Sequence, residues 1–305
     1  MTALGKVVVF GGTGFLGRAI TSRLVAGGIE TFVAARQPAQ AWNSDRNNSA
    51  GLVRPVEADI RDEQQIRQAI ESCDGVVNAV GLYVEKRSET FEAIHVSGAQ
   101  RLASLVAELG IGRLVHISGI GADEASRSDY VRARAKGDVA VKQACPWATI
   151  MRPSALFGPN DGLLTGLAGL VRRLPIVPLF GRGQTRLQPV HVDDVAAGVA
   201  AALNAPDAPG RIYELGGHGT YRYAELLQLI SAWVAKRRMY VPVPFPVWDF
   251  LAMAGSVLPN PPLTPAQMAL MRADNVVGHN APSLVDLGVE PSSLETFLQS
   301  HPPPN

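Results

Sequence analysis

Short apolar runs alternate with longer helical patterns through the first half of the chain. Six of these runs are rich in β-branched residues and apolar on both faces, which is typical of strands covered by helices on both sides. They span residues 6–10, 30–35, 52–59, 75–80, 113–118 and 147–153. Between them, apolar residues recur at helical spacing over residues 15–26, 63–72, 89–109 and 130–144. This order predicts an α/β fold with a doubly wound parallel sheet of the Rossmann type and a smaller C-terminal lobe.

The pattern changes after Arg152, where prolines and glycines become frequent. Irregular crossings are expected there, because both residue types interrupt regular structure. Residues 192–205 again have helical spacing, and residues 211–217 form one more apolar run. The main sheet is therefore expected to continue beyond the irregular part.

These patterns divide the chain into two parts. We predict an NAD(P)-binding Rossmann core over residues 1–153 and a smaller, partly irregular lobe over residues 154–305. Within the lobe, residues 186–217 are expected to return to the core sheet. The proline-rich tail from Val241 is expected to pack as a cap beside the carboxyl edge of the sheet.

The charge balance narrows the range of partners. With 28 basic and 27 acidic side chains, the chain has no overall field that would attract nucleic acid, so no nucleic-acid partner is expected. Cys73 and Cys145 form neither a CxxC pair nor a zinc spacing, and we interpret both as structural core residues.

Two further features concern location. The first apolar run begins at Lys6, which leaves no room for a leader ahead of it and predicts a cytoplasmic protein. The apolar stretch 247–258 is shorter than the ~20 residues that a bilayer requires, so no transmembrane segment is expected. A buried helix is favoured there over one that lies against an apolar surface, although peripheral contact at the cytoplasmic face of the inner membrane is an alternative.

A glycine-rich loop follows the first predicted strand directly. In "GGTGFLG", Gly11 permits a tight turn, Gly14 lets the backbone approach a pyrophosphate, and Gly17 allows close packing of helix on strand. The anion would lie at the helix N-terminus. The loop therefore predicts a dinucleotide site that also includes Thr13, Phe15 and Leu16.

Arginines favour a phosphorylated form of that dinucleotide. The second strand ends at Arg36, where NAD-binding proteins place an acidic residue on the ribose. A guanidinium can pair with a 2′-phosphate bidentately, so NADP(H) is favoured over NAD(H). Arg18 can join the same pocket, and solvated surface positions are the alternative for both arginines. Asp59, next to Ile60, is placed to accept from the adenine amino group, or else to cap the following helix.

The assembled motifs resemble the short-chain dehydrogenase/reductase superfamily, in its extended or atypical branch. The cofactor loop, the adenine contact, the wall beneath the cofactor, the strand before the active site and the turn after the sixth strand match in order: "GGTGFLG", "ADIRD", "NAVG", "LVHIS" and "MRPSALFGP". The resemblance adds Ala79, Val80, Gly81 and Pro153 to the cofactor residues. More narrowly, segments such as "RLPIVPLFGRGQTRLQPVHVDDVA" and "LPNPPLTPAQMALMRADNVV" resemble the dehydrogenase-fold accessory subunit of respiratory complex I and its bacterial relatives.

The resemblance also implies a catalytic helix, and here the chain departs from the pattern. Active members use a tyrosine and a lysine four residues later, and Tyr130 is instead followed by Arg134 in the lysine position. Lys136 is six residues from Tyr130 and falls on another face. Arg134 can hold a ribose and favour the phenolate, but it cannot pass on a proton. Ser118 is the candidate hydroxyl partner, with a strand-end bond to backbone as its alternative.

Other candidate groups have simpler structural interpretations. His95 lies in a helical pattern and is expected to pack there. His191, Asp193 and Asp194 are read as strand end, N-cap and helix start rather than as a metal or relay site. No metal site is predicted.

Three functions follow from these observations. The leading hypothesis is an NADP(H)-binding atypical dehydrogenase with a structural or weakly catalytic nucleotide, related to the complex I subunit. The resemblance implies respiratory complex I or quinone-related proteins as partners. The first alternative is a free-standing NADPH-dependent reductase, an oxidoreductase of a small carbonyl or quinone-like compound. The second is an enzyme of the sugar-nucleotide epimerase or dehydratase kind, which an apolar, proline-rich lobe disfavours.

Overall fold

The computed structural model describes residues 4–38, 51–86, 88–255 and 265–303. One seven-stranded sheet dominates it, and every neighbouring pair of its strands is parallel. The strands run across the sheet in the order β11 (Ile212–Leu215), β6 (Thr149–Pro153), β5 (Leu114–Ile117), β4 (Gly75–Asn78), β1 (Lys6–Phe10), β2 (Glu30–Ala35) and β3 (Val53–Glu57). The predicted Rossmann-type sheet is confirmed, and the order reverses between β1 and β4, where such sheets bind ligands.

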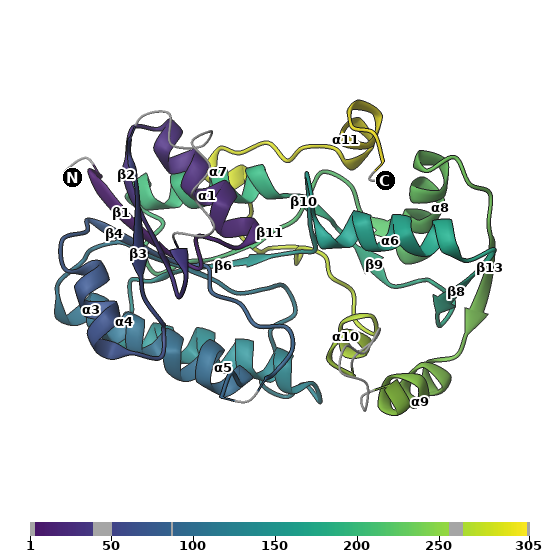
Figure 1. Ribbon diagram of the computed structural model, residues 1–305, viewed down its shortest axis with the longest axis horizontal. Helices are drawn as coiled ribbons and strands as arrows, with labels where there is room; N and C mark the ends of the chain where they lie inside the picture. Colours follow the sequence, from purple (N-terminus) through teal and green to yellow (C-terminus); the bar gives the residue numbers. More distant parts are fainter. Residues whose placement is uncertain (1–3, 39–50, 87, 256–264, 304–305) are drawn as a thin grey trace.

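Helices cover both faces of this sheet (Figure 1). One face carries α1 (Phe15–Ala26) and α7 (Val192–Asn204), and the other carries α3 (Glu63–Ile70), α4 (Ala99–Glu108) and α5 (Asp129–Ala144). Alternate residues of β1 supply the two cores, because successive side chains of a strand point to opposite faces: Val7 and Val9 pack with α1 and α7, and Val8 and Phe10 pack beneath α3 and α4.

The segment predicted as a single helix over 89–109 has two parts. Glu92–Gly98 is a π-helix, and α4 follows it directly. Gly137 of α5 packs against this wider turn so closely that an added Cβ would lie 2.1 Å from the carbonyl oxygen of His95. Wider turns of this kind occur mostly as single insertions and often near functional sites. Sequence periodicity did not distinguish it from an ordinary helix.

A smaller lobe stands beside the carboxyl edge of the sheet. Its helices and short strands are β7 (Leu156–Phe157), α6 (Gly162–Arg173), β8 (Ile176–Phe180), β9 (Arg186–Leu187), β10 (Val190–His191), β12 (Tyr221–Arg222), α8 (Tyr223–Trp233), β13 (Met239–Val243), α9 (Phe245–Gly255), α10 (Pro265–Leu270), the 3-10 turn Val285–Leu287 and α11 (Leu294–Ser300). The strands pair as β7 with β10, β9 with β12 and β8 with β13. Between them the chain returns to the main sheet through α7 and β11, as the apolar runs predict.

The part of the tail around Asn275 packs at the carboxyl edge of the sheet, whereas Val241 and α9 lie at the far end of the smaller lobe, away from the sheet. Asn275 accepts hydrogen bonds from the Ser154 hydroxyl (2.6 Å) and the Ala155 backbone N–H (2.9 Å), just after β6. This contact joins positions 121 residues apart and closes the lobe over the sheet edge.

The predicted burial of the apolar stretch 247–258 is wrong for the part that the structure describes. Residues 247–255 lie in α9, and Val247, Phe250, Leu251 and Met253 of that helix are exposed. Only Ala252 of α9 is fully buried. Residues 256–258 fall outside the described part. Among the described helices, none combines the length and the apolarity that crossing a membrane requires.

Candidate functional site

A cavity of about 1470 Å³ lies between the carboxyl edge of the sheet and the smaller lobe. Every residue that the sequence indicated for cofactor binding or catalysis lines it. These are Gly11, Thr13, Gly14, Phe15, Leu16, Gly17, Arg18, Arg36, Asp59, Ile60, Ala79, Val80, Gly81, Ser118, Tyr130, Arg134 and Pro153. The fold thus brings one set of distant segments to a single site, and the role of each residue there remains a prediction.

The glycine loop has the shape needed to hold an anion. Gly11 has a φ of 75°, and a Cβ there would lie 2.7 Å from the carbonyl oxygen of Ala79. At Gly17 an added Cβ would lie 2.1 Å from the carbonyl oxygen of Gly11. No side chain caps the first turn of α1, which starts after Gly14. Its backbone N–H groups and helix dipole are therefore available to a phosphate.

Arginines and acids are paired at the far end of β2 and β3. Arg36 forms an ion pair with Glu89, and both side chains line the cavity. Arg18 is exposed and donates from Nε to the Thr13 carbonyl oxygen at 2.9 Å, which fixes it beside the loop. Three guanidinium groups thus border this end of the cavity once Arg61 is included.

Arg61 holds both carboxylate oxygens of Asp59. Its Nη2 donates to Oδ2 at 2.6 Å and its Nε to Oδ1 at 3.0 Å. This hydrogen bonding keeps the pKa of Asp59 below its ordinary value, so the carboxylate is charged. The helix-cap alternative for Asp59 is wrong, because Asp62 is the residue whose side chain caps α3, accepting from the Gln65 N–H.

Tyr130 lies in an aromatic environment at the other end of the cavity. Its ring is stacked with that of Tyr83, with centroids 5.6 Å apart, and makes edge contacts with Phe91 and His95. Burial raises the pKa of Tyr130 to about 12, and the nearby charge of Arg134 only partly opposes this. The predicted effect of Arg134 thus has the expected sign, but burial outweighs it and the phenol stays protonated at neutral pH.

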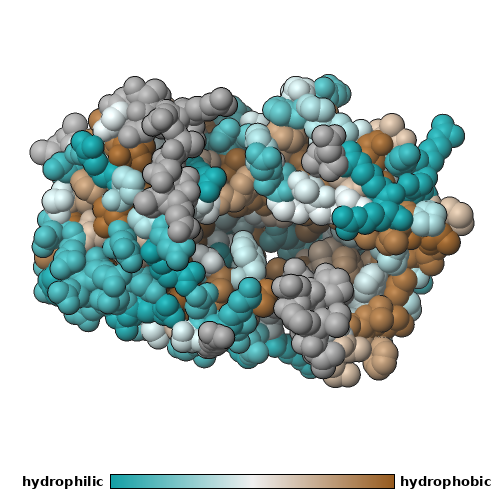
Figure 2. Space-filling model, in the orientation of Figure 1, coloured by the Kyte–Doolittle hydropathy of each residue, from teal (hydrophilic) through white to brown (hydrophobic). Residues whose placement is uncertain are grey.

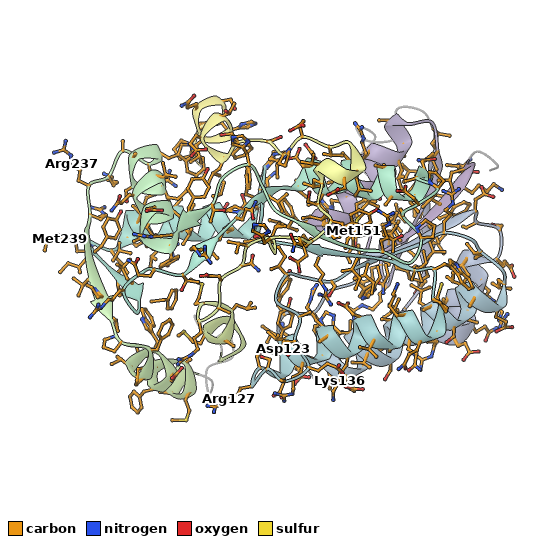
Figure 3. All side chains as sticks on the ribbon, turned by 180° about the vertical axis from the view of Figure 1, so that it is seen from behind. Asp123, Arg127, Lys136, Met151, Arg237 and Met239 are labelled. Carbon is orange, nitrogen blue, oxygen red and sulfur yellow. The ribbon has the colours of Figure 1, made fainter. Side chains whose placement is uncertain are left out.

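The register of α5 places Arg134 in the cavity and Lys136 outside it. The guanidinium carbon of Arg134 lies 5.4 Å from the Tyr130 ring centroid, and its Nη1 donates to the Ser118 carbonyl oxygen at 3.2 Å. Arg134 Nε is buried and has no hydrogen-bond partner among the described residues. Lys136 is exposed on the outer side of the helix (Figure 3). Arg134 therefore lies in the cavity beside Tyr130, and Lys136 does not.

Ser118 sits above a buried polar network. Its hydroxyl is buried on the side of Asp138 and makes no hydrogen bond to backbone among the described residues, so the strand-end alternative is not what the structure contains. Beneath it, Asp138 accepts from Nε and Nη2 of Arg152, each at 2.9 Å. Burial raises the pKa of Asp138 above its ordinary value, and the charge of Arg152 opposes that rise.

His116 completes the network as a neutral side chain. Asn78 Nδ2 lies 3.1 Å from His116 Nδ1, which makes Nδ1 the acceptor and leaves the proton on Nε2, facing Asp138 at 3.7 Å. Burial lowers the pKa of His116 to about 3. The network connects β4, β5 and β6 to α5 and thereby fixes the floor of the site.

The wall contributed by the smaller lobe has a different character. It contains no charged side chain among the described residues. Its members are Ser154, Ala155, Leu156, Asn160, Gly162, Leu163, Leu187, Leu270, Met271 and Asn275. On the side of this wall, a ligand would meet apolar groups, a hydroxyl and two amides, and no cation that could bind a second phosphate.

The remaining sequence candidates are structural. His95 is buried, with Nε2 2.9 Å from the Leu82 carbonyl oxygen, and burial lowers its pKa to about 3. His191 caps α7 by accepting from the Asp193 N–H, and Asp194 turns away to accept from Ser292.

The two cysteines lie in the interior of the fold. Cys73 and Cys145 are buried free thiols, and burial raises the pKa of each to about 11. Within the described ranges, no group of three His, Cys, Asp or Glu side chains has metal-ligand geometry.

The fold and the glycine loop define a Rossmann-type protein built to hold a dinucleotide. Residues 7–216 match the family model described as NAD dependent epimerase/dehydratase family. The chain belongs to this family, within the short-chain dehydrogenase/reductase superfamily, and its relatives include subunits of respiratory complex I. The family binds nicotinamide dinucleotides.

Three individual proteins show how similar the chain is to its relatives in sequence and in fold. The chain is 34% identical to the NADH dehydrogenase [ubiquinone] 1 alpha subcomplex subunit 9 of Arabidopsis thaliana, over 95% of this chain and 75% of that protein. It is 30% identical to a ceramide reductase of Caulobacter vibrioides, over 67% of this chain and 62% of that protein. The fold matches the UDP-glucose 4-epimerase of Thermus thermophilus in complex with NAD, with a TM-score of 0.66, 20% identity and coverage of 96% of each chain.

Among the cavity residues that sequence reasoning missed are the polar side chains of Arg61, Tyr83 and Glu89. Arg61 carried a local signal, because it lies two positions after Asp59 at a strand end. Tyr83 and Glu89 carried none, since they follow β4 in an irregular segment whose path depends on tertiary packing.

Proposed function

We propose that the chain holds NADP(H) as a bound nucleotide whose role is structural or weakly catalytic. The observation that carries this proposal is the pairing of a buried Tyr130, whose pKa lies at about 12, with Arg134 in the lysine position. A general acid/base works best with a pKa near the operating pH, and this phenol is far from it. An arginine beside it holds a ribose but passes no proton.

The preference for NADP(H) rests on the arginines at the adenosine end. Arg36 follows the last residue of β2, where an acidic side chain would repel a 2′-phosphate. Arg18 and Arg61 lie in the same end of the cavity and add positive charge. Arg61 donates to both carboxylate oxygens of Asp59, so an adenine amino group would have to share one of these oxygens with Arg61.

The proposal extends to partners. The similarity to the Arabidopsis subunit supports assembly with respiratory complex I or with quinone-related proteins. We also propose a cytoplasmic location with peripheral contact at the cytoplasmic face of the inner membrane.

A second candidate is a free-standing NADPH-dependent reductase. Ser118 and Tyr130 are both present in the cavity, and the uncharged wall beside them suits an apolar carbonyl or quinone-like compound. The similarity to a protein named ceramide reductase favours the same class. The epimerase or dehydratase alternative is weaker, because a sugar nucleotide needs cations for its phosphates and this wall offers none.

Purification of the protein, followed by an assay of NADPH oxidation, distinguishes the structural role from the reductase. Under the leading proposal, NADPH copurifies with the protein, exchanges slowly with added nucleotide, and is not oxidised when quinones or carbonyls are supplied. Nicotinamide absorbance reports the turnover. Rapid oxidation that disappears in Tyr130→Phe would replace the structural role with the reductase.

A further inference from the structure

The end of the smaller lobe farthest from the sheet carries a continuous apolar surface. Its exposed members, here called the outer apolar face, are Leu174, Ile176, Met239, Val241, Val247, Phe250, Leu251 and Met253. Met239, Phe250 and Met253 are 67%, 63% and 65% exposed. Figure 2 shows this face as the brown surface at the end of the molecule formed by β13 and α9. Contiguous exposure on this scale marks a contact surface rather than ordinary scatter.

The strands of this face carry apolar side chains on both of their sides. β8 and β13 pair in register, Ile176 with Met239 and Pro178 with Val241, so these side chains share one side of a two-stranded ribbon. Val177 and Leu179 point to the other side and are buried. A ribbon with one side on the core normally presents polar residues outward. Here both sides are apolar.

α9 continues the face beyond β13. Trp248 anchors it inward, because its Nε1 donates to the Leu179 carbonyl oxygen at 3.1 Å. The exposed side of the helix carries Val247, Phe250, Leu251 and Met253. A helix that is apolar on its solvent side needs a further apolar environment.

Cations border this face, and the acidic groups around it are few. Arg173 ends α6, and Lys236 and Arg237 precede β13; all three are exposed and form no ion pair with the described residues. Arg237 and Met239 point outward from the same end of the molecule (Figure 3). Over residues 170–182 and 234–255 the single acid is Asp249, which pairs with Arg272. The overall charge of +1 therefore conceals a local basic cluster.

We propose that the outer apolar face docks on an anionic lipid bilayer. Its apolar side chains would enter the acyl boundary while Arg173, Lys236 and Arg237 meet lipid phosphates, the combination that holds peripheral proteins at an interface. A symmetric dimer through this face would bring two basic clusters toward each other, which disfavours a second copy as the occupant. The inference rests on the peripheral contact in the proposed function and names its surface, but it requires neither bound nucleotide nor turnover.

Vesicle flotation tests the proposal directly. The full chain is expected to float with phosphatidylcholine vesicles that contain phosphatidylglycerol, and to float less with phosphatidylcholine alone. Phe250→Asp combined with Met253→Asp should lower the affinity at least tenfold. Val285→Asp, at a position 57% exposed on the turn next to α7, is the matched control and should bind as the wild type does.

Charge reversal provides the second arm. Arg173→Glu and Arg237→Glu should each weaken binding to the anionic vesicles by about fivefold or more and leave binding to neutral vesicles unchanged. NADPH binding by every variant checks that it is folded, so a failure here is distinct from a failure of the nucleotide proposal. Failure of the wild-type chain to bind anionic vesicles would overturn the inference. So would binding that Phe250→Asp with Met253→Asp leaves intact, or sedimentation showing that these substitutions abolish a dimer.

Discussion

Arg36 at the end of β2 is paired with Glu89, a residue 53 positions later in the chain, at the border of the nucleotide cavity. The carboxylate of Glu89 therefore pairs with the guanidinium group of Arg36, which the sequence assigned to binding a 2′-phosphate. The pair is partly solvated, with side-chain exposures of 59% and 27%, so water screens it. A phosphate carries more charge than a carboxylate and can displace it, and Glu89 then competes with the nucleotide for Arg36.

Replacing the arginine should reverse the cofactor preference. Arg36→Asp is expected to weaken NADPH binding by about 10- to 150-fold, the value of one or two charged hydrogen bonds, and to leave NADH binding nearly unchanged. Titration with each nucleotide, followed by fluorescence, measures both constants. Arg23→Asp changes an exposed arginine of α1 outside the cavity and is the control. An unchanged NADPH constant in Arg36→Asp would remove this residue from the pocket.

Replacing Glu89 should have the opposite effect on the affinity for NADPH. Glu89→Gln removes the competing carboxylate, and because a surface ion pair is worth about 0.2–1 kcal/mol, NADPH affinity should rise by up to about fivefold. NADH has no 2′-phosphate, so its affinity should stay the same. Glu92→Gln, at an exposed position three residues later, is the matched control. A loss of NADPH affinity would mean that Glu89 supports the site.

Restoring the lysine tests whether Arg134 limits the chemistry. Arg134→Lys returns a side chain that can exchange a proton, and a trace reductase activity should increase about tenfold or more. Lys136→Arg, on the exposed side of α5, should change nothing. The rate of NADPH oxidation with quinones is the measurement. If affinity is retained and the rate does not increase, the burial of Tyr130 limits the reaction instead.

Close packing beneath the site gives a stability prediction. Gly137→Ala places a Cβ against the backbone of His95 and should lower the free energy of unfolding by about 1–3 kcal/mol or more. Gly166→Ala, in α6 with no atom within 4 Å of the added Cβ, should raise it by about 0.5–1 kcal/mol. Urea unfolding of both variants provides the comparison. Equal effects would contradict the packing of α5 on the π-helix.

Buried His95 should make the fold sensitive to acid. Its pKa is about 3 in the folded chain because of burial and the nearby charge of Arg134, whereas an unfolded histidine titrates near ~6.5. The unfolded state therefore binds more protons between these values. The contribution of neutral His95 to the free energy of unfolding is fully present above about pH 6.5. It falls by up to about 1.4 kcal/mol for each pH unit below that value.

The comparison of wild type with His95→Gln isolates this effect. The variant should have a shallower decline of unfolding free energy between about pH 6.5 and 3, the range set by the unfolded and folded pKa values of His95. His279→Gln, at an exposed position, is the control. Parallel curves for wild type and His95→Gln would show that His95 is not held neutral.

Local periodicity was sufficient for much of the fold. The seven strands of the main sheet and α1, with bounds of 15–26, agree with the apolar patterns, because a two- or 3.6-residue repeat records which side of an element is buried. The same repeat placed Arg134 inside the cavity and Lys136 outside it. The glycine loop could also be predicted from the sequence, because its turn and its close contacts leave no room for a Cβ atom.

Tertiary structure alone decided the electrostatics of the site and the surface of the lobe. Tyr83 and Phe91 enclose Tyr130 and raise its pKa, and Glu89 reaches Arg36, because loops distant in sequence meet at the edge of the sheet. In the same way, the apolar pattern of α9 indicates a helix that needs apolar surroundings, but not which ones. A sequence determines which side chains a segment has, while burial and charge pairing depend on what the rest of the chain places beside them, and for α9 the described residues leave that side open.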